Sequence, residues 1–162
     1  MRAQILTALL LAATLSACGG GGDNTASGSG ASAPAPVSDA DKLKLLASLP
    51  APYNTADIAN GQSKFAQCRS CHTIAPDGAN MSGPNLHGLF GRKVGTHEGF
   101  KYSDALKASG ITWDATSLDP WVESPRTHVP GTKMVFAGLK NPKDRIDLIG
   151  YLKTEAGDAP AT

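Results

Sequence analysis

The hydrophobic and polar positions divide this chain into three parts. A nearly unbroken apolar run occupies Ile5–Ala17, and the stretch from Gly19 to about Val37 holds no large apolar residue before Val37 itself. Beyond that stretch, apolar residues recur in short segments at helical spacing. This spacing predicts helices near residues 57–68, 103–108, 116–123 and 142–154. Each is too short to be stable alone, so the pattern predicts an all-α domain whose helices are held together by tertiary packing.

The first part has the features of an export signal. A positive charge at Arg2 precedes the apolar run, and a run of 13 residues falls short of the roughly 20 that a membrane-spanning helix needs. The run ends in Leu15–Cys18, which resembles the bacterial lipobox, whose cysteine receives a diacylglycerol group. We therefore predict a lipoprotein signal over residues 1–17 and a lipid on Cys18. An ordinary secretory signal and an uncleaved signal anchor are the alternatives.

The second part is a predicted flexible tether. Residues 18–37 consist mainly of Gly, Ser, Ala and Pro, a composition that cannot offset the entropy lost on ordering. A short helix and connector are predicted over residues 38–55, because Ser38 begins a capping sequence and Pro50 ends the helical pattern. A folded domain over residues 56–157 and a tail over 158–162 complete the predicted organisation.

The leucines of the predicted helix after Ser38 share one face. Leu43, Leu46 and Leu49 are expected to pack on the domain. A helix that lies on a membrane surface is the alternative, although this helix is short for that role.

Composition narrows the possible functions further. The formal net charge of +1 gives no reason to expect a nucleic acid or a strongly acidic partner. The chain has 18 Gly and 11 Pro and only 6% aromatic residues, which indicates a small globular unit with flexible sequence. A small domain of this kind usually needs a disulfide, a metal or a cofactor to be stable.

The remaining two cysteines, Cys68 and Cys71, indicate which cofactor stabilises the domain. Cys68-Arg69-Ser70-Cys71-His72 is a C-x-x-C-H sequence, in which two thiols add to the haem vinyl groups and the following imidazole lies beneath the iron. A redox dithiol has no need of the adjoining histidine. A zinc site lacks a second pair of cysteines. The sequence therefore predicts one covalent haem c, with His72 as an iron ligand.

The ligand on the other face of the iron decides between a carrier and a catalyst. The candidates are His87, His97, His128, Met81 and Met134. A rigid Pro-Gly turn precedes Met134 in the sequence PGTKM, which would present the thioether from a loop. A thioether opposite imidazole raises the reduction potential and leaves no position for oxygen or peroxide. We therefore predict Met134 as the second axial ligand, with His97 in a solvated Gly-rich loop.

Several further segments of the domain have characteristic residues in a characteristic order and spacing. They are Gly61…Phe65-x-x-Cys68-x-x-Cys71-His72-Thr73, Gly83–Arg92, Phe100-x-Tyr102-Ser103-x-Ala105, Gly110–Trp113, Val129–Gly138 and Arg145–Leu152. In content and spacing they resemble class I cytochrome c of the mitochondrial and alpha-proteobacterial type. The resemblance implies an all-α cytochrome c fold, in which short helices wrap around one covalently attached haem.

The resemblance also implies roles for individual residues. The Pro84 carbonyl would orient His72 by accepting its other ring N–H, and His87 would be structural. The first helix would cross the last near Gly61 and Phe65. The haem propionates would be bound by Tyr102, Trp113 and Thr132, with Arg92 supplying charge. Partner docking would involve Arg69, Arg126, Lys133 and Lys140, an incomplete version of the lysine ring of soluble relatives.

Two positions depart from the family's usual residues. The family often has Asn at Leu106 and Tyr at Trp121, within a buried polar network. A more apolar surrounding disfavours the additional charge of oxidised haem. We therefore expect a reduction potential at least as high as is usual for the family.

These features predict an electron carrier and no enzymatic activity. We expect a monomer on the periplasmic side of a bacterial membrane, anchored through Cys18, in a respiratory chain. It would shuttle electrons from a membrane quinol-cytochrome c oxidoreductase to a terminal cytochrome oxidase. A fixed haem subunit of an oxidase or dehydrogenase complex is the main alternative, and a haem peroxidase is a further one.

Overall fold

The structure, a computed structural model, describes residues 37–160. Within that range the chain forms helices and loops and no strands, with isolated bridges at Phe90–Asp158 and Lys93–Thr112. The prediction of an all-α fold is therefore confirmed. The predicted signal over residues 1–17, the lipidated Cys18 and nearly all of the 18–37 tether lie outside the described residues. Among the helices described, none is long and apolar enough to cross a membrane.

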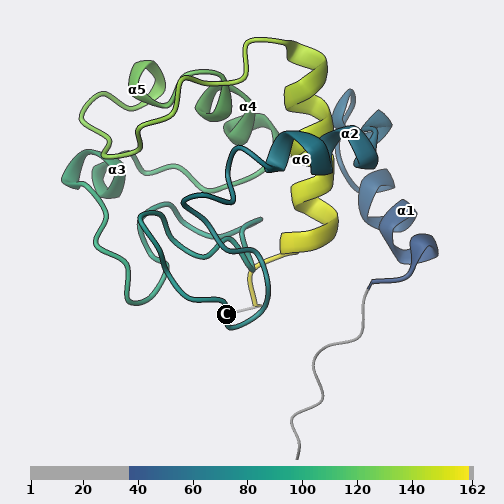
Figure 1. Ribbon diagram of the computed structural model, residues 1–162, viewed down its shortest axis with the longest axis horizontal. Coiled ribbons are helices and arrows are strands. Elements are labelled where there is room, and N and C mark those ends of the chain that lie inside the picture. Colours follow the sequence, from purple (N-terminus) through teal and green to yellow (C-terminus); the bar gives the residue numbers. More distant parts are fainter. Residues whose placement is uncertain (1–36, 161–162) are drawn as a thin grey trace, which may run out of the picture. The chain divides into compact units, whose positions relative to one another are not determined.

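The helices of the described residues are short, and the last of them is the longest. In chain order they are α1 (Asp39–Ala47), the 3₁₀ helix η1 (Tyr53–Thr55), α2 (Ile58–Phe65), α3 (Asp104–Ala108), α4 (Ala115–Glu123), α5 (Pro125–His128) and α6 (Pro142–Ala156). Figure 1 shows α2 crossing α6, with α1 beyond them at the edge of the domain and α3, α4 and α5 on the other side. The helices predicted near 57–68, 103–108, 116–123 and 142–154 are present, whereas η1 and α5 were not predicted.

Capping side chains explain where five of these helices begin. At each start a side-chain oxygen accepts a hydrogen bond from a backbone N–H in the first turn, which otherwise has no partner within the helix. The acceptor residues are Ser38 for α1, Asp57 for α2, Ser103 for α3, Asp114 for α4 and Asn141 for α6. Because these contacts are local, the helix starts follow directly from the sequence.

Helices α2 and α6 cross at a glycine. A Cβ added to Gly61 would lie 2.1 Å from the carbonyl oxygen of Asp147 and 2.7 Å from Cβ of Tyr151, so only glycine permits this approach. One turn later, the rings of Phe65 and Tyr151 lie 5.4 Å apart. Leu148 is buried at the same crossing. This is the crossing that the family resemblance implied.

The segment before α2 packs on the other side of α6. Leu46 and Leu49 are buried, as expected, and Cδ2 of Leu46 approaches Gly150 of α6. The expectation for Leu43 was wrong, because its side chain is 68% exposed. The neighbouring residue Lys42 instead faces the end of α6, where it pairs with Glu155 at 2.8 Å.

A polar contact ties this N-terminal segment to the centre of the domain. The buried Tyr53 of η1 donates a 2.9 Å hydrogen bond to Asp119 of α4. Asp119 also forms an ion pair with Arg145 of α6, which donates to the carbonyl oxygens of Leu139 and Lys140. Burial and the contact with Asp119 raise the pKa of Tyr53 to about 12. The segment before α2 is thus part of the folded unit.

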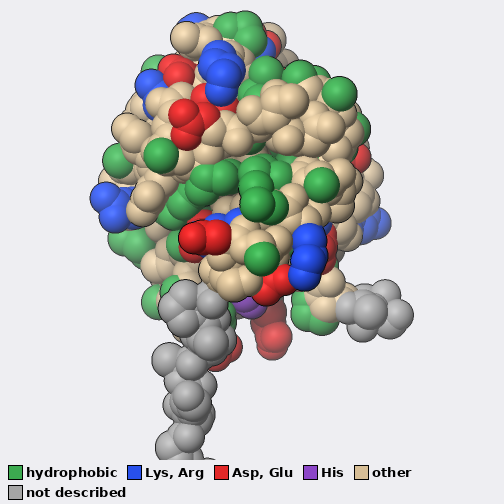
Figure 2. All heavy atoms as spheres, turned by 90° about the vertical axis from the view of Figure 1, so that its right-hand side faces the viewer, with side chains coloured by type: hydrophobic (Ala, Val, Ile, Leu, Met, Phe, Trp, Pro, Cys, Tyr) green, Lys and Arg blue, Asp and Glu red, His purple; other side chains and the backbone are tan. Residues whose placement is uncertain are grey.

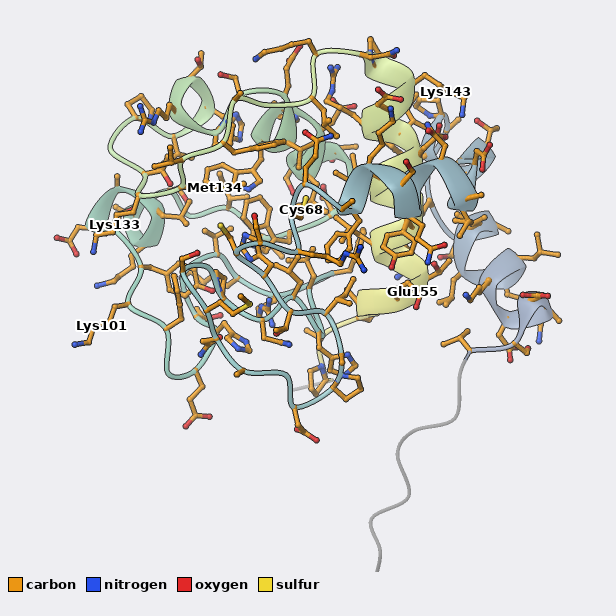
Figure 3. The ribbon with its side chains drawn as sticks, in the orientation of Figure 1. Cys68, Lys101, Lys133, Met134, Lys143 and Glu155 are labelled. Atoms are coloured by element: carbon orange, nitrogen blue, oxygen red, sulfur yellow. The ribbon has the colours of Figure 1, made fainter. Side chains whose placement is uncertain are left out.

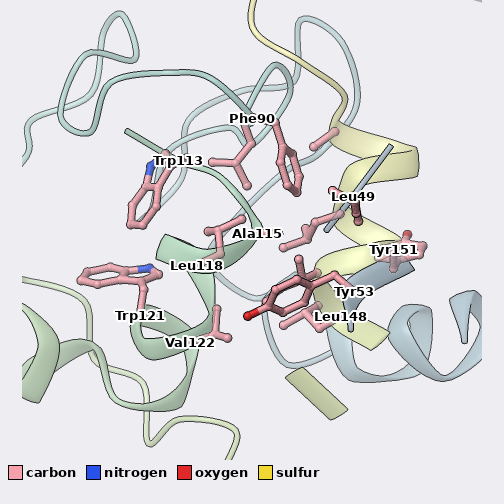
Figure 4. Packing of buried hydrophobic residues seen from close by; sticks show 14 of the residues in the cluster. Leu49, Tyr53, Phe90, Trp113, Ala115, Leu118, Trp121, Val122, Leu148 and Tyr151 are labelled. Carbon is pink, nitrogen blue, oxygen red and sulfur yellow. The ribbon is translucent and has the colours of Figure 1, made fainter. Parts of the chain in front are cut away.

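The core lies between α4 and α6. Figure 4 shows Leu118 and Val122 of α4 facing the α6 side, with Trp113 and Trp121 at their flank. The two indole rings lie 5.5 Å apart and are inclined to one another. On the outer face near α1, charged side chains of both signs surround a band of hydrophobic ones (Figure 2), so this face has no strongly charged patch.

Candidate haem site

The C-x-x-C-H sequence forms a tight turn directly after α2. The backbone N–H groups of Cys71 and His72 both donate to the carbonyl of Cys68, at 3.0 and 2.9 Å. This turn places both cysteines and the histidine on the wall of one cavity. The cysteines are not joined to each other. Burial, with a smaller effect from Cys71, raises the pKa of the free Cys68 thiol to about 11.

The imidazole of His72 is fixed by the segment that contains Pro84. Nδ1 of His72 lies 2.7 Å from the Pro84 carbonyl oxygen, which can only accept, so Nδ1 carries the proton. Nε2 is left with a free lone pair. Burial lowers the pKa of His72, and the Pro84 contact opposes this effect in part. A Cβ on Gly83 would lie 2.3 Å from Cε1 of the ring, so the backbone packs directly against the imidazole.

Asn85 holds this segment in place. Its buried side chain donates to Thr73 Oγ1 at 2.6 Å and to the Ala75 carbonyl at 3.0 Å. Its side-chain oxygen accepts the backbone N–H of His87 at 2.8 Å. The ring of His87 is exposed, whereas its backbone takes part in the segment. This arrangement is compatible with the structural role expected for His87.

One cavity of about 300 Å³ brings the predicted haem residues together. Its lining includes Cys68, Cys71, His72, Pro84, Arg92, Tyr102, Trp113, Thr132 and Met134. The rest of the wall is largely apolar and includes the two departures from the family pattern, Leu106 and Trp121, both buried. Figure 3 shows Cys68 near the centre of the domain and Met134 on the side away from α6. Residues distant in the sequence therefore converge on one apolar space.

The guanidinium of Arg92 lies in the cavity wall without a carboxylate among its hydrogen-bond partners. It donates to the carbonyl oxygens of His87 at 2.8 Å and Asn85 at 3.3 Å, and Nη1 lies 3.0 Å from Nδ1 of His97. Its charge is not neutralised by these contacts. The expectation that His97 is solvated was wrong, because its ring is half-buried against Arg92. A loop histidine carries no sequence signal for such a contact.

The residues present fit a covalent haem. Two cysteines can form the thioether links, and His72 Nε2 and the Met134 sulfur are suitable iron ligands. Arg92 offers an unneutralised positive charge for the carboxylates of a haem, and the apolar walls suit the macrocycle. Thr132 accepts the backbone N–H of Met134 at 3.3 Å, which leaves its own O–H free to donate.

The exposed part of the lining forms the mouth of the cavity. It consists of Gln67, Ser70, Cys71, Ser82, Lys101, Lys133 and Val135. Among these residues the charged side chains are Lys101 and Lys133, which lie on the same side of the molecule as Met134 (Figure 3). Sequence reasoning missed Lys101 and Val135, although each is adjacent to a predicted site residue. Val135 is 80% exposed.

The predicted docking residues occupy different environments. Arg69, Arg126 and Lys133 are exposed, and Lys133 lies at the mouth. Lys140 is also exposed, but its Nζ donates to the carbonyl oxygen of Glu123 at 2.6 Å, which holds its charge against the end of α4.

The fold and the site define a c-type haem protein, and comparison with known proteins agrees. The family model described as cytochrome c matches residues 58–156. Cytochrome c2 of Rhodomicrobium vannielii is 48% identical over 105 residues, which are 65% of this chain and 84% of that protein. Cytochrome c of Gibberella zeae is 52% identical over 98 residues, covering 60% of this chain and 92% of that protein.

A solved structure shows the same arrangement of the chain. Cytochrome cH from Methylobacterium extorquens is 47% identical, with a TM-score of 0.58, and the match covers 61% of this chain and 99% of that one. The chain belongs to the cytochrome c family and carries a covalently attached c-type haem. Proteins of this family are electron carriers. Residues 38–57, which include α1 and η1, precede the part matched by the family model.

Proposed function

We propose that this chain is a membrane-anchored electron carrier in which His72 and Met134 are the axial ligands of the haem iron. The observation that carries the proposal is the single cavity lined by Cys68, Cys71, His72 and Met134. The haem iron, when bound, supplies one-electron chemistry. If protein side chains filled both axial positions, no position would be open for a substrate.

The residues around the ligands hold the site in one geometry. Pro84 fixes the ring orientation of His72 and increases its basicity by accepting the Nδ1 proton. Four residues of the cavity lining are proposed to bind the haem carboxylates: Arg92, Tyr102, Trp113 and Thr132. The apolar wall that includes Leu106 and Trp121 excludes water. Because these groups are already in place, little reorganisation is needed when the charge of the iron changes.

The mouth of the cavity is the proposed docking surface. It combines two positive charges, at Lys101 and Lys133, with the exposed apolar side chain of Val135. Positive charge steers association with an acidic partner surface, and the apolar contact suits a short-lived complex. Arg69 and Arg126 add positive charge outside the lining. We propose that the partners are a quinol-cytochrome c oxidoreductase as donor and a terminal cytochrome oxidase as acceptor.

The proposed anchor is a lipid on Cys18 at the periplasmic side of a bacterial membrane. The composition of residues 18–37 supports a flexible tether between this anchor and the domain. Tethering raises the effective concentration near membrane partners to about the millimolar range. The higher effective concentration offsets the weaker electrostatic steering by a docking surface that has fewer positive charges than a full lysine ring.

Ligand substitution tests the proposed axial site. The reduced wild-type protein should not bind carbon monoxide at neutral pH, whereas Met134→Ala should open the iron and bind it. Met81→Ala is the matched control, because Met81 is 47% exposed and does not line the cavity. Carbon monoxide binding by the wild type, or by neither variant, would overturn the assignment of Met134.

Removal of the anchor tests the tether. Cys18→Ser should release the protein from membranes and lower the rate of its oxidation by membranes at equal bulk concentration. Equal oxidation rates for both forms would contradict a role for the tether. Purification in a stable stoichiometric complex with an oxidase or dehydrogenase would instead indicate a fixed haem subunit.

A further inference from the structure

The ring of His97 contacts one of the charged residues in the cavity wall. Nη1 of Arg92 lies 3.0 Å from Nδ1 of His97. The other acceptors of the Arg92 guanidinium are the carbonyl oxygens of His87 and Asn85. Among these three acceptors, only the imidazole can change its protonation state near neutral pH.

The contact requires a neutral imidazole. A guanidinium has donors and no acceptor, so Nδ1 of His97 must accept and the ring proton must lie on Nε2. A doubly protonated ring has no acceptor. Proton uptake therefore removes the hydrogen bond and places a second positive charge beside Arg92.

The surroundings of His97 contain few other charged groups. Burial and the neighbouring Arg92 lower its pKa, and Glu98 opposes this shift. Burial raises the pKa of Tyr102, which also lines the cavity, and Arg92 and the backbone of His97 oppose this shift. When haem is bound, Arg92 and Tyr102 in the cavity wall would hold its carboxylates, which would add negative charge to this region.

We propose that His97 is a positioning residue for Arg92 that makes the reduction potential depend on pH. This inference rests on the haem site proposed above. A proton on His97 adds positive charge near the site, and that charge disfavours oxidised iron more than reduced iron. When one electron arrives from an external donor, His97 binds protons from the solvent more tightly.

The direction of the effect follows from this coupling. By linkage, protonation of His97 and reduction of the haem favour one another equally. The potential should therefore rise as the pH falls below the ordinary histidine pKa of 6.5, since the pKa of His97 is lowered from that value. At higher pH, Arg92 stays bound to neutral His97, and the potential no longer changes through protonation of His97.

Redox titrations of the haem-loaded protein at several pH values from about 5 to 8 test this inference. His97→Asn should remove the rise at low pH but keep the potential at the alkaline end, because the amide oxygen can still accept from Arg92. His97→Ala should lose both the rise and the acceptor, and so shift the alkaline potential as well. His87→Asn is the matched control and should behave as wild type, because only the carbonyl of His87 contacts Arg92.

A second measurement distinguishes proton uptake by His97 from proton uptake by the haem carboxylates. Nuclear magnetic resonance of the His97 ring should give a higher pKa in the reduced protein than in the oxidised protein. Equal pKa values in the two states, or superimposable potential curves for wild type and His97→Asn, would overturn the proposal. Carbon monoxide binding by the wild type would instead show that the axial assignment had failed.

Discussion

The carbonyl oxygen of Pro84 lies 2.7 Å from Nδ1 of His72, and Gly83 packs against the same imidazole. The two contacts fix both the tautomer and the plane of the ring. The short segment around Pro84 therefore determines how His72 is presented to the cavity.

Gly83→Ala should displace the His72 ring, because the new Cβ would lie 2.3 Å from Cε1. We expect an altered visible spectrum and a shifted reduction potential, since the orientation of the ring affects its bond to iron. Ser63→Ala is the control, as Ser63 is exposed and does not line the cavity. Identical spectra for Gly83→Ala and wild type would contradict the close contact between Gly83 and the His72 ring.

Leu46→Ala should destabilise the domain by about 2–5 kcal/mol, the usual range for a buried leucine. Leu46 is 7% exposed and contacts α6 at Gly150. Leu43→Ala, on the same helix, should change the free energy of unfolding by less than about 0.5 kcal/mol, because Leu43 is 68% exposed. Chemical denaturation of both variants measures the difference. Equal effects would mean that α1 is not docked on α6.

Tyr53→Phe should cost about 1 kcal/mol of stability at neutral pH, because it removes the hydrogen bond to Asp119 and keeps the ring. The folded state raises the pKa of Tyr53 from 10.0 to about 12, mainly through burial. Between these two values the folded state binds more protons than the unfolded state, so stability falls as pH rises.

Denaturation at a series of pH values tests whether stability falls as the pH rises. Wild type should lose more stability than Tyr53→Phe as the pH rises from 10.0 to about 12. Parallel losses in both proteins would show that other groups, such as lysines, account for the whole effect.

Leu106→Asn and Trp121→Tyr should each lower the reduction potential. Both residues are buried and line the cavity, and a more polar side chain at either position would better tolerate the charge of oxidised haem. Redox titration against wild type measures the change. Potentials that stay the same or rise would refute the expectation of a high potential from this apolar wall.

Local sequence determined the helix starts and the turn that carries the cysteines, because these features depend only on residues close together in the chain. Helix starts could be predicted because each cap lies within three residues of the N–H that it binds, as Ser103 does with Leu106. The Cys68–His72 turn could be predicted for the same reason. The helices η1 and α5 could not be, because three or four residues are too few to show a helical period. Of the wider site, Arg92 and Tyr102 were found only through family resemblance.

Tertiary structure decided the contacts between distant parts of the chain. Leu43 and Leu46 share a helical pattern, yet only the second meets α6. Tyr53 binds Asp119 across 66 positions of sequence. Asn80 donates to the Glu98 carbonyl 18 positions away, and this contact holds the loop in which His97 meets Arg92. Caps and turns are set by chain geometry over a few residues, whereas these pairings depend on how the helices pack around the cavity, and no periodicity encodes that.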